Sequence, residues 1–148
     1  DVYKRQVQEW IEIDPSIDLA TYFSQDLDEL RRMALFDAII NNTDRKIGHL
    51  LPTVNSGLFG CDHGVTFHQE DKLRTVLWQW SGNNLMNAEI ALLEKCRQGL
   101  TGELGELLSP LLTDEEIQAS KNRVDRLLLN KMFPEPSPDW PAVPWPAF

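Results

Sequence analysis

The segment from Asn41 to His68 gathers most of the groups in this sequence that are suited to catalysis. It contains all three histidines and four of the eight glycines of the 148-residue chain. Asp44 is followed by two basic residues, and Asp62 stands beside an imidazole. Two carboxylates, an imidazole and two cations can hold a divalent metal together with a polyanion. Phosphoryl transfer requires that combination.

A predicted helix delivers the chain to this segment. Apolar residues from about Asp26 to Ile40 recur at helical spacing. We expect the helix to end at Asn41 and Asn42, because asparagine tolerates the left-handed conformation of a helix C-cap. Asp44 then lies in the loop after the helix, where a rigid element holds it in place.

A predicted β-hairpin connects the two aspartates. Leu50–Val54 and Leu58–Cys61 have the composition of strands, and Asn55–Ser56–Gly57 between them is typical of a tight turn. A hairpin of this length brings the chain back close to its start, so the groups on either side of it are predicted to converge on one small volume. These groups are Asp44, Arg45, Lys46, His49 and Asp62.

The regions before the first long helix and after the hairpin have weaker patterns. Apolar residues between Val7 and Ile13 predict a short helix that Asp14–Pro15 ends, followed by a loop to Ser24. Lys72–Trp80 is rich in β-branched and aromatic residues and is predicted to be extended.

The last third is predicted to be helical before its final segment. Asn87 is expected to cap a helix that closes at Gly99. A short helix is expected over Glu103–Leu108. Thr113 and Glu116 have the spacing of a capping box, which starts a helix that runs to about residue 131.

The two ends of the chain differ from the rest. The opening residues 1–6 resemble translated sequencing-adapter read-through and include no initiator methionine, so we expect them to be non-native and the native protein to continue upstream. An ordinary processed N-terminus is the alternative. The segment 134–148 holds six prolines and two tryptophans, so it is predicted to be extended and to pack on the domain or on a partner. Residues 1–133 are therefore predicted to form one domain and residues 134–148 a tail.

Composition and charge limit the function classes. The chain has 42% hydrophobic and 25% charged residues and a formal net charge of -9, an ordinary globular composition. This charge repels phosphate backbones and argues against nucleic-acid binding. No apolar run approaches the roughly 20 residues of a transmembrane segment. The two cysteines, Cys61 and Cys96, lack metal-ligand spacing and indicate a reducing, cytoplasmic location.

Two short motifs carry a resemblance. Asp44–His49 has the sequence DRKIGH, and Cys61–Gly64, after the hairpin, has the sequence CDHG. In this order they resemble the catalytic and metal-binding loops of the protein-kinase-like superfamily, above all its phosphatidylinositol 3-/4-kinase-like branch. With KLRTVLWQW downstream, they are especially similar to a bacterial family grouped in that branch. The resemblance covers about Leu30–Trp80. It implies an α+β, mainly helical fold, the C-lobe of a kinase-like fold with a small β-hairpin at the active site.

The resemblance also implies a role for each matching residue. Asp44 matches the catalytic aspartate that orients the substrate hydroxyl or accepts its proton, and Lys46 matches the basic residue placed against the γ-phosphate. Asp62 matches the aspartate that chelates the Mg²⁺ bridging the nucleotide phosphates, and Gly64 matches the turn after it. His49 stands where the family has an asparagine metal ligand, so Mn²⁺ is tolerated or the second metal is weakly held. ATP with Mg²⁺ or Mn²⁺, and an unidentified hydroxyl-bearing substrate, are the implied ligands.

The predicted function is that of the C-lobe of an ATP-dependent phosphotransferase acting on an alcohol. The chain lacks the glycine-rich loop and strand lysine of an N-lobe, so activity is expected only in the full-length protein. A non-catalytic pseudokinase or interaction module is one alternative, which the histidine at position 49 favours. A metal-dependent hydrolase using His49, Asp62, His63 and His68 is another. Asp62 and His63 are adjacent in sequence, and adjacent side chains on an extended backbone point to opposite faces. This argues against a hydrolase site that uses both.

Overall fold

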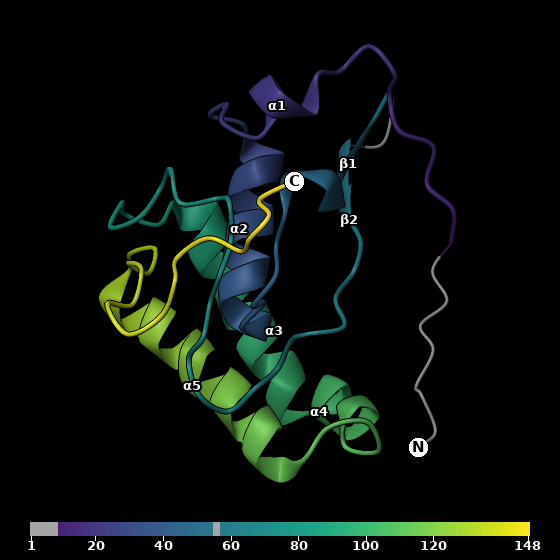
Figure 1. Ribbon diagram of the computed structural model, residues 1–148. Helices are drawn as coiled ribbons and strands as arrows, with labels where there is room; N and C mark the ends of the chain where they lie inside the picture. Colours follow the sequence, from purple (N-terminus) through teal and green to yellow (C-terminus); the bar gives the residue numbers. More distant parts are fainter. Residues whose placement is uncertain (1–8, 55–56) are drawn as a thin grey trace.

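The computed structural model describes residues 9–54 and 57–148. The strands β1 (Leu50–Thr53) and β2 (Gly57–Gly60) pair as a two-stranded antiparallel sheet, with Leu50 opposite Gly60 and Thr53 opposite Gly57. The predicted α+β, mainly helical class and the predicted hairpin are thus confirmed (Figure 1). In chain order the elements are α1 (Leu19–Tyr22), α2 (Asp28–Ile40), the 3₁₀ helix η1 (Ile47–His49), β1 (Leu50–Thr53), β2 (Gly57–Gly60), α3 (Asn87–Thr101), α4 (Glu103–Leu108) and α5 (Asp114–Asn130).

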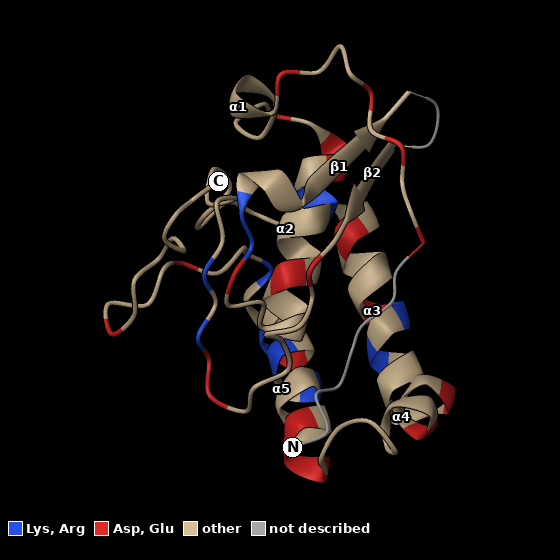
Figure 2. Ribbon diagram, turned by 45° about the vertical axis from the view of Figure 1, so that its right-hand side comes forward, with Lys and Arg blue, Asp and Glu red and all other residues tan. Residues whose placement is uncertain are grey.

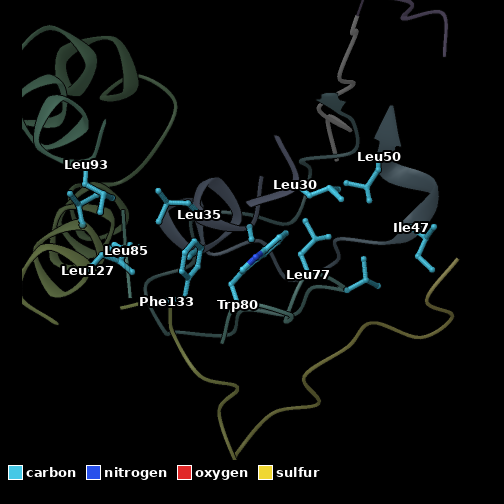
Figure 3. Close-up of a cluster of buried hydrophobic side chains, with 14 of the residues drawn as sticks. Leu30, Leu35, Ile47, Leu50, Leu77, Trp80, Leu85, Leu93, Leu127 and Phe133 are labelled. Atoms are coloured by element: carbon cyan, nitrogen blue, oxygen red, sulfur yellow. The ribbon is translucent and has the colours of Figure 1, made fainter. Parts of the chain in front are cut away.

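A buried apolar cluster joins the three long helices to the hairpin region (Figure 3). Burying each large side chain of this kind stabilises the fold by about 1.5–3 kcal/mol. Ile47 and Leu50 belong to the cluster, so η1 and the first strand are anchored in the core. The cluster also includes Leu30 and Leu35 of α2, Leu93 of α3, Leu127 of α5, and Leu77, Trp80, Leu85 and Phe133 from the segments between and after them.

The ends of α2 and α5 follow the predicted signals. Asn41 adopts the left-handed conformation (φ 54°), and its N–H donates to the carbonyl of Asp37. At the start of α5 the N–H of Glu116 donates to Thr113 Oγ1 (3.3 Å), and the N–H of Thr113 donates to Glu116 Oε2 (2.8 Å). The predicted capping box is therefore present. Lys131, the expected last residue of this helix, is its left-handed C-cap (φ 53°).

The prediction of a helix over residues 7–13 is wrong in its described part, residues 9–13, which contain no helix. Trp10 is 90% exposed, so no packed apolar face supports a turn of helix there, and a short helix without tertiary packing is unstable in water. Val7 and Gln8 lie outside the described residues. The predicted loop to Ser24 contains one helical turn, α1, where Asp18 Oδ1 accepts the N–H of Ala20 (3.2 Å).

Two predictions downstream of the hairpin are also corrected. Lys72–Trp80 forms no strand over this described range, only a single parallel bridge between Thr75 and Arg45. Asn87 is the first residue of α3 and not its cap. The N-cap is the preceding residue, Met86, whose N–H donates to Glu89 Oε2 (2.6 Å).

The predicted boundaries of α3 and of the hairpin turn shift slightly. α3 continues past Gly99 to Thr101. Of the predicted turn, Asn55 and Ser56 lie outside the described residues. Gly57 has a φ of +79° and begins β2, so a glycine allows the backbone conformation required there.

The tail, residues 134–148, contains no helix or strand over its described length, as predicted. It runs back over the domain and ends beside η1 (Figure 1). The carbonyl of Ala142 accepts the N–H of Thr75 (3.1 Å), and the carbonyl of Ala147 accepts the N–H of Ile47 (2.9 Å). The tail is thus tied to the segment that carries the candidate site.

The two tail tryptophans have different surroundings. The ring of Trp140 lies under Lys72, whose Nζ is 4.8 Å from the ring centroid, a cation–π contact. Trp145 is 89% exposed. The expectation of packing on the domain is therefore met by Trp140 and not by Trp145.

Candidate functional site

Two loops meet beyond the C-terminal end of α2. The first site loop is residues 41–49 and the second is residues 61–64. The N–H of Cys61 donates to the carbonyl of His49 (3.1 Å). Arg45 Nη1 donates to that same carbonyl (3.3 Å) and to the carbonyl of Cys61 (3.1 Å). The hairpin thus returns the chain to the loop that carries Asp44.

Arg45 is fully buried, which contradicts its predicted place among the site cations. Its Nη2 lies 2.9 Å from Asp37 Oδ1, and its Nε donates to Asp37 Oδ2 (3.0 Å). A guanidinium suits such a buried, bidentate pair because it presents several donors in a fixed plane. Its charge is balanced within the fold, so Arg45 positions the two site loops and is not available to a bound anion.

Asp37 is the residue that sequence reasoning missed. Its carboxylate is fully buried and accepts from Asn42 Nδ2 (3.0 Å) and Thr75 Oγ1 (3.4 Å) in addition to Arg45. The available signal was its position seven residues after Leu30, on the apolar face of α2. Because an unpaired buried carboxylate is very unfavourable, an aspartate there indicates a buried cationic partner.

Asp44 and Lys46 form a partly accessible pair in the first site loop. Lys46 Nζ is 3.6 Å from Asp44 Oδ2, and the two side chains are 22% and 29% exposed. The N–H of Asp44 donates to Asn42 Oδ1 (3.0 Å), a hydrogen bond within this loop. The Asp44 carboxylate is therefore held by its backbone and by one cation, and remains accessible to a hydroxyl group.

Asp62 and His49 form a second partly accessible pair. His49 Nε2 is 3.6 Å from Asp62 Oδ2, and the side chains are 16% and 58% exposed. The N–H of Lys46 donates to His49 Nδ1 (3.4 Å), which connects this pair to the first. The structure thus links Asp44, Lys46, His49 and Asp62 in one continuous set of contacts.

The backbone of the second site loop turns at Asp62, whose φ is +55°. Aspartate is one of the few non-glycine residues that occupy this region, and such residues are enriched at functional sites. Gly64 lies at a bend but does not have a positive φ. A Cβ added to Gly64 would lie 3.7 Å from Asp62 Oδ1, an ordinary contact. The predicted bend at Gly64 is present, and the left-handed residue is Asp62.

His63 holds the second site loop against Arg45 and α2. Its Nε2 lies 2.8 Å from Arg45 Nη2, and its ring packs edge-on against Phe36 with centroids 5.6 Å apart. Burial and the Arg45 guanidinium lower the pKa of His63 below its usual value. The ring is therefore neutral near pH 7, with one nitrogen committed to Arg45.

Within residues 9–54 and 57–148, no three His, Cys, Asp or Glu side chains are grouped so that they could hold a metal ion by themselves. His63 faces Arg45, and His68 Nδ1 accepts the N–H of Glu70 (3.0 Å). The four-residue cluster required for the hydrolase alternative is therefore not formed by these described side chains. A Mg²⁺ that arrives with nucleotide phosphates needs one or two carboxylates and water, and the exposed Asp62 fits that requirement.

An apolar hollow of about 460 Å³ lies between residues 9–13 and the hairpin. Leu51 of β1 and Cys61 line it on the hairpin side. Burial raises the pKa of the Cys61 thiol, so this cysteine is mainly protonated at neutral pH. Cys61 directly precedes Asp62 in the chain, so one wall of the hollow is formed by the second site loop.

Part of the net negative charge of the chain lies far from this site. Acidic residues of α4 and of the first turn of α5 gather at the end of the molecule opposite the hairpin (Figure 2). The net charge of -9 therefore does not arise at the site alone. None of the helices in the described part of the chain has the length and apolar character needed to cross a bilayer.

The chain is similar in sequence to a longer bacterial protein. The chain is 42% identical over 119 residues to Protein Rv2133c of Mycobacterium tuberculosis, a match that covers 80% of this chain and 42% of the relative. The chain thus spans less than half the length of that protein. No protein-family model matches the chain, and no solved structure matches it.

Proposed function

We propose that this chain is the C-lobe of a kinase-like phosphotransferase that transfers the γ-phosphoryl group of ATP to a hydroxyl group. The observation that carries the proposal is the set of contacts from Asp44 through Lys46 and His49 to Asp62. The resemblance of DRKIGH and CDHG to kinase loops assigns the same residues to one site. The hairpin brings together the two loops that such a mechanism requires.

Each group has a chemical task in this proposal. The Asp44 carboxylate orients the acceptor hydroxyl and takes its proton as the new O–P bond forms and ADP leaves. Lys46 offsets negative charge on the transferring phosphoryl group. Asp62 would hold Mg²⁺, or Mn²⁺, which when bound neutralises the nucleotide phosphates. Arg45 and Asp37 fix the loops and contact no reactant.

The apolar hollow supports a place for the nucleotide base. The apolar faces of a nucleotide base fit a hollow of this kind, and Cys61, on its hairpin side, directly precedes Asp62 in the chain. This chain spans less than half the length of its relative, and the rest of the complete protein would supply the remaining nucleotide contacts.

The test compares two variants of the complete protein. Asp44→Asn should lower ATP turnover, measured as ADP formation with lipid, protein and small-molecule alcohols, by more than about 10²-fold while nucleotide affinity is nearly kept. Asp62→Asn should also abolish metal-dependent nucleotide binding, measured by calorimetry. Asp125→Asn, in a surface ion pair of α5 with Arg97, is the matched control.

Two results would decide against the proposal. Unchanged turnover in both site variants would remove Asp44 and Asp62 from the chemistry. A wild-type protein that binds no nucleotide with Mg²⁺ or Mn²⁺ would support the non-catalytic interaction module instead.

A further inference from the structure

The two ring nitrogens of His49 have different partners. The N–H of Lys46 donates to Nδ1 (3.4 Å), so Nδ1 carries no proton. A neutral imidazole has one protonated nitrogen, which must then be Nε2. Nε2 is the atom that faces Asp62 Oδ2, at 3.6 Å. The ring therefore presents an N–H group to the carboxylate.

His63, the residue after Asp62 in the chain, has the opposite arrangement. Its Nε2 lies 2.8 Å from Arg45 Nη2, and a guanidinium can only donate. His63 Nε2 therefore accepts, and the proton of the neutral ring is on Nδ1. His49 and His63 are thus held in opposite tautomers by fixed partners, a backbone N–H and a buried arginine.

A neutral imidazole binds a metal through its unprotonated nitrogen. In His49 that nitrogen is already used by the backbone of Lys46, and the nitrogen nearest Asp62 carries a proton. We propose that His49 is a positioning residue for the Asp62 carboxylate and is not a metal ligand. This inference rests on the proposed function for the metal and the nucleotide, and it replaces the ligand role that the resemblance suggests for position 49.

Without a histidine ligand, the site should prefer Mg²⁺. Among the residues that the structure describes, Asp62 would then be the one ligand to a divalent cation, and phosphate and water oxygens would complete the coordination. An all-oxygen set suits Mg²⁺, whereas a ring nitrogen would favour Mn²⁺ and later transition metals. Asp62 requires such support because its side chain is largely exposed and its backbone is in the left-handed region. A group that orients a ligating carboxylate typically contributes about 10- to 100-fold in metal affinity.

The first test reads the tautomers directly. Two-bond ¹H–¹⁵N correlation spectra of the complete protein at alkaline pH should show His49 protonated at Nε2 and His63 protonated at Nδ1. A His49 ring protonated at Nδ1 would overturn the inference whatever the protein does with nucleotide.

The second test separates orientation from ligation. His49→Gln keeps an N–H donor near the Nε2 position, so Mg²⁺-dependent ATP binding should stay within about threefold of wild type, while His49→Ala should lose about tenfold or more. His68→Gln, at an exposed histidine, is the control for the substitution itself. Equal losses in the Gln and Ala variants would contradict the positioning role.

A third test examines whether a histidine nitrogen is bonded to the metal. Pulsed EPR of the Mn²⁺–ATP complex of the wild-type protein should show no directly bound histidine nitrogen. A nitrogen coupling that His49→Gln removes would identify His49 as a ligand and overturn the inference. Failure of the protein to bind nucleotide, with the tautomers as stated, would instead count against the proposed function alone.

Discussion

Arg45 and Lys46 are neighbours in sequence with opposite environments. The Arg45 guanidinium is fully buried against Asp37, whereas the Lys46 ammonium is partly exposed beside Asp44. The backbone explains the difference, since Arg45 is bridged to Thr75 and its side chain points inward, while the next side chain points outward. Arg45 therefore holds the site loops in place, whereas Lys46 is accessible to a bound ligand.

Cys61 provides a residue-level test of the nucleotide hollow. In the complete protein, Mg²⁺–ATP at ten times its dissociation constant should slow alkylation of Cys61 by about tenfold, because bound nucleotide covers the thiol. The reaction is best followed by peptide mass spectrometry at alkaline pH, since burial raises the pKa of this thiol.

Cys96 is the internal control for that experiment. Burial raises the pKa of its thiol as well, and it belongs to α3, away from the residues that line the hollow. Equal slowing at both cysteines would indicate a general change in structure. No slowing at Cys61 would place the nucleotide base elsewhere.

α2 connects the core to the site through its last turn. Its apolar face packs into the core, and Asp37 on that face pairs with Arg45 of the first site loop. Asn41 ends the helix, and its side chain donates to the carbonyls of His68 (2.9 Å) and Glu70 (2.6 Å). The helix therefore positions both the site loop and the segment that follows the hairpin.

Asp37→Asn should destabilise the protein by about 3–5 kcal/mol, because it leaves the Arg45 charge buried without a counter-ion. Urea unfolding followed by circular dichroism measures the change. Asp125→Asn is the matched control, since its pair with Arg97 is about half exposed and such pairs contribute roughly 0–1 kcal/mol. Equal effects of the two substitutions would contradict a buried pair at Asp37.

Across the whole molecule, the tail closes the structure onto the site region. It leaves the end of α5, crosses the domain and finishes beside η1 (Figure 1). Besides the two backbone hydrogen bonds at Ala142 and Ala147, the indole Nε1 of Trp78 donates to the Ala142 carbonyl (2.8 Å), and Pro144 is fully buried. The tail is packed as part of the domain, although composition alone separates it.

Removal of residues 134–148 should lower stability by about 2–4 kcal/mol, since four hydrogen bonds of about 0.5–1.5 kcal/mol each are lost together with the buried proline. The amides of Ile47 and Thr75 should also exchange with solvent faster, because their acceptors lie in the tail. Hydrogen exchange measured by NMR reports the loss of global stability and the faster exchange of these two amides. Trp145→Ala, at an exposed side chain, should change stability by no more than about 0.5 kcal/mol. Unchanged exchange at both amides in the truncated protein would show that the tail is dispensable.

The sequence by itself determined the elements whose signals are local. The helical spacing of α2, the left-handed Asn41, the capping box of α5 and the hairpin were all predictable, because each depends on residues close together in the chain. The order of the motifs around the hairpin likewise identified the candidate site residues. Their proposed role in phosphoryl transfer stays a prediction.

The tertiary structure decided the features that depend on distant partners. Arg45 is buried because Asp37, Cys61 and His63 surround it, and residues 9–13 form no helix because their apolar side chains find no packed face. The tail's course depends on acceptors that meet donors about 65 to 100 positions earlier in the chain. No local pattern encodes such contacts, since their free energy comes from burial that only the assembled fold provides.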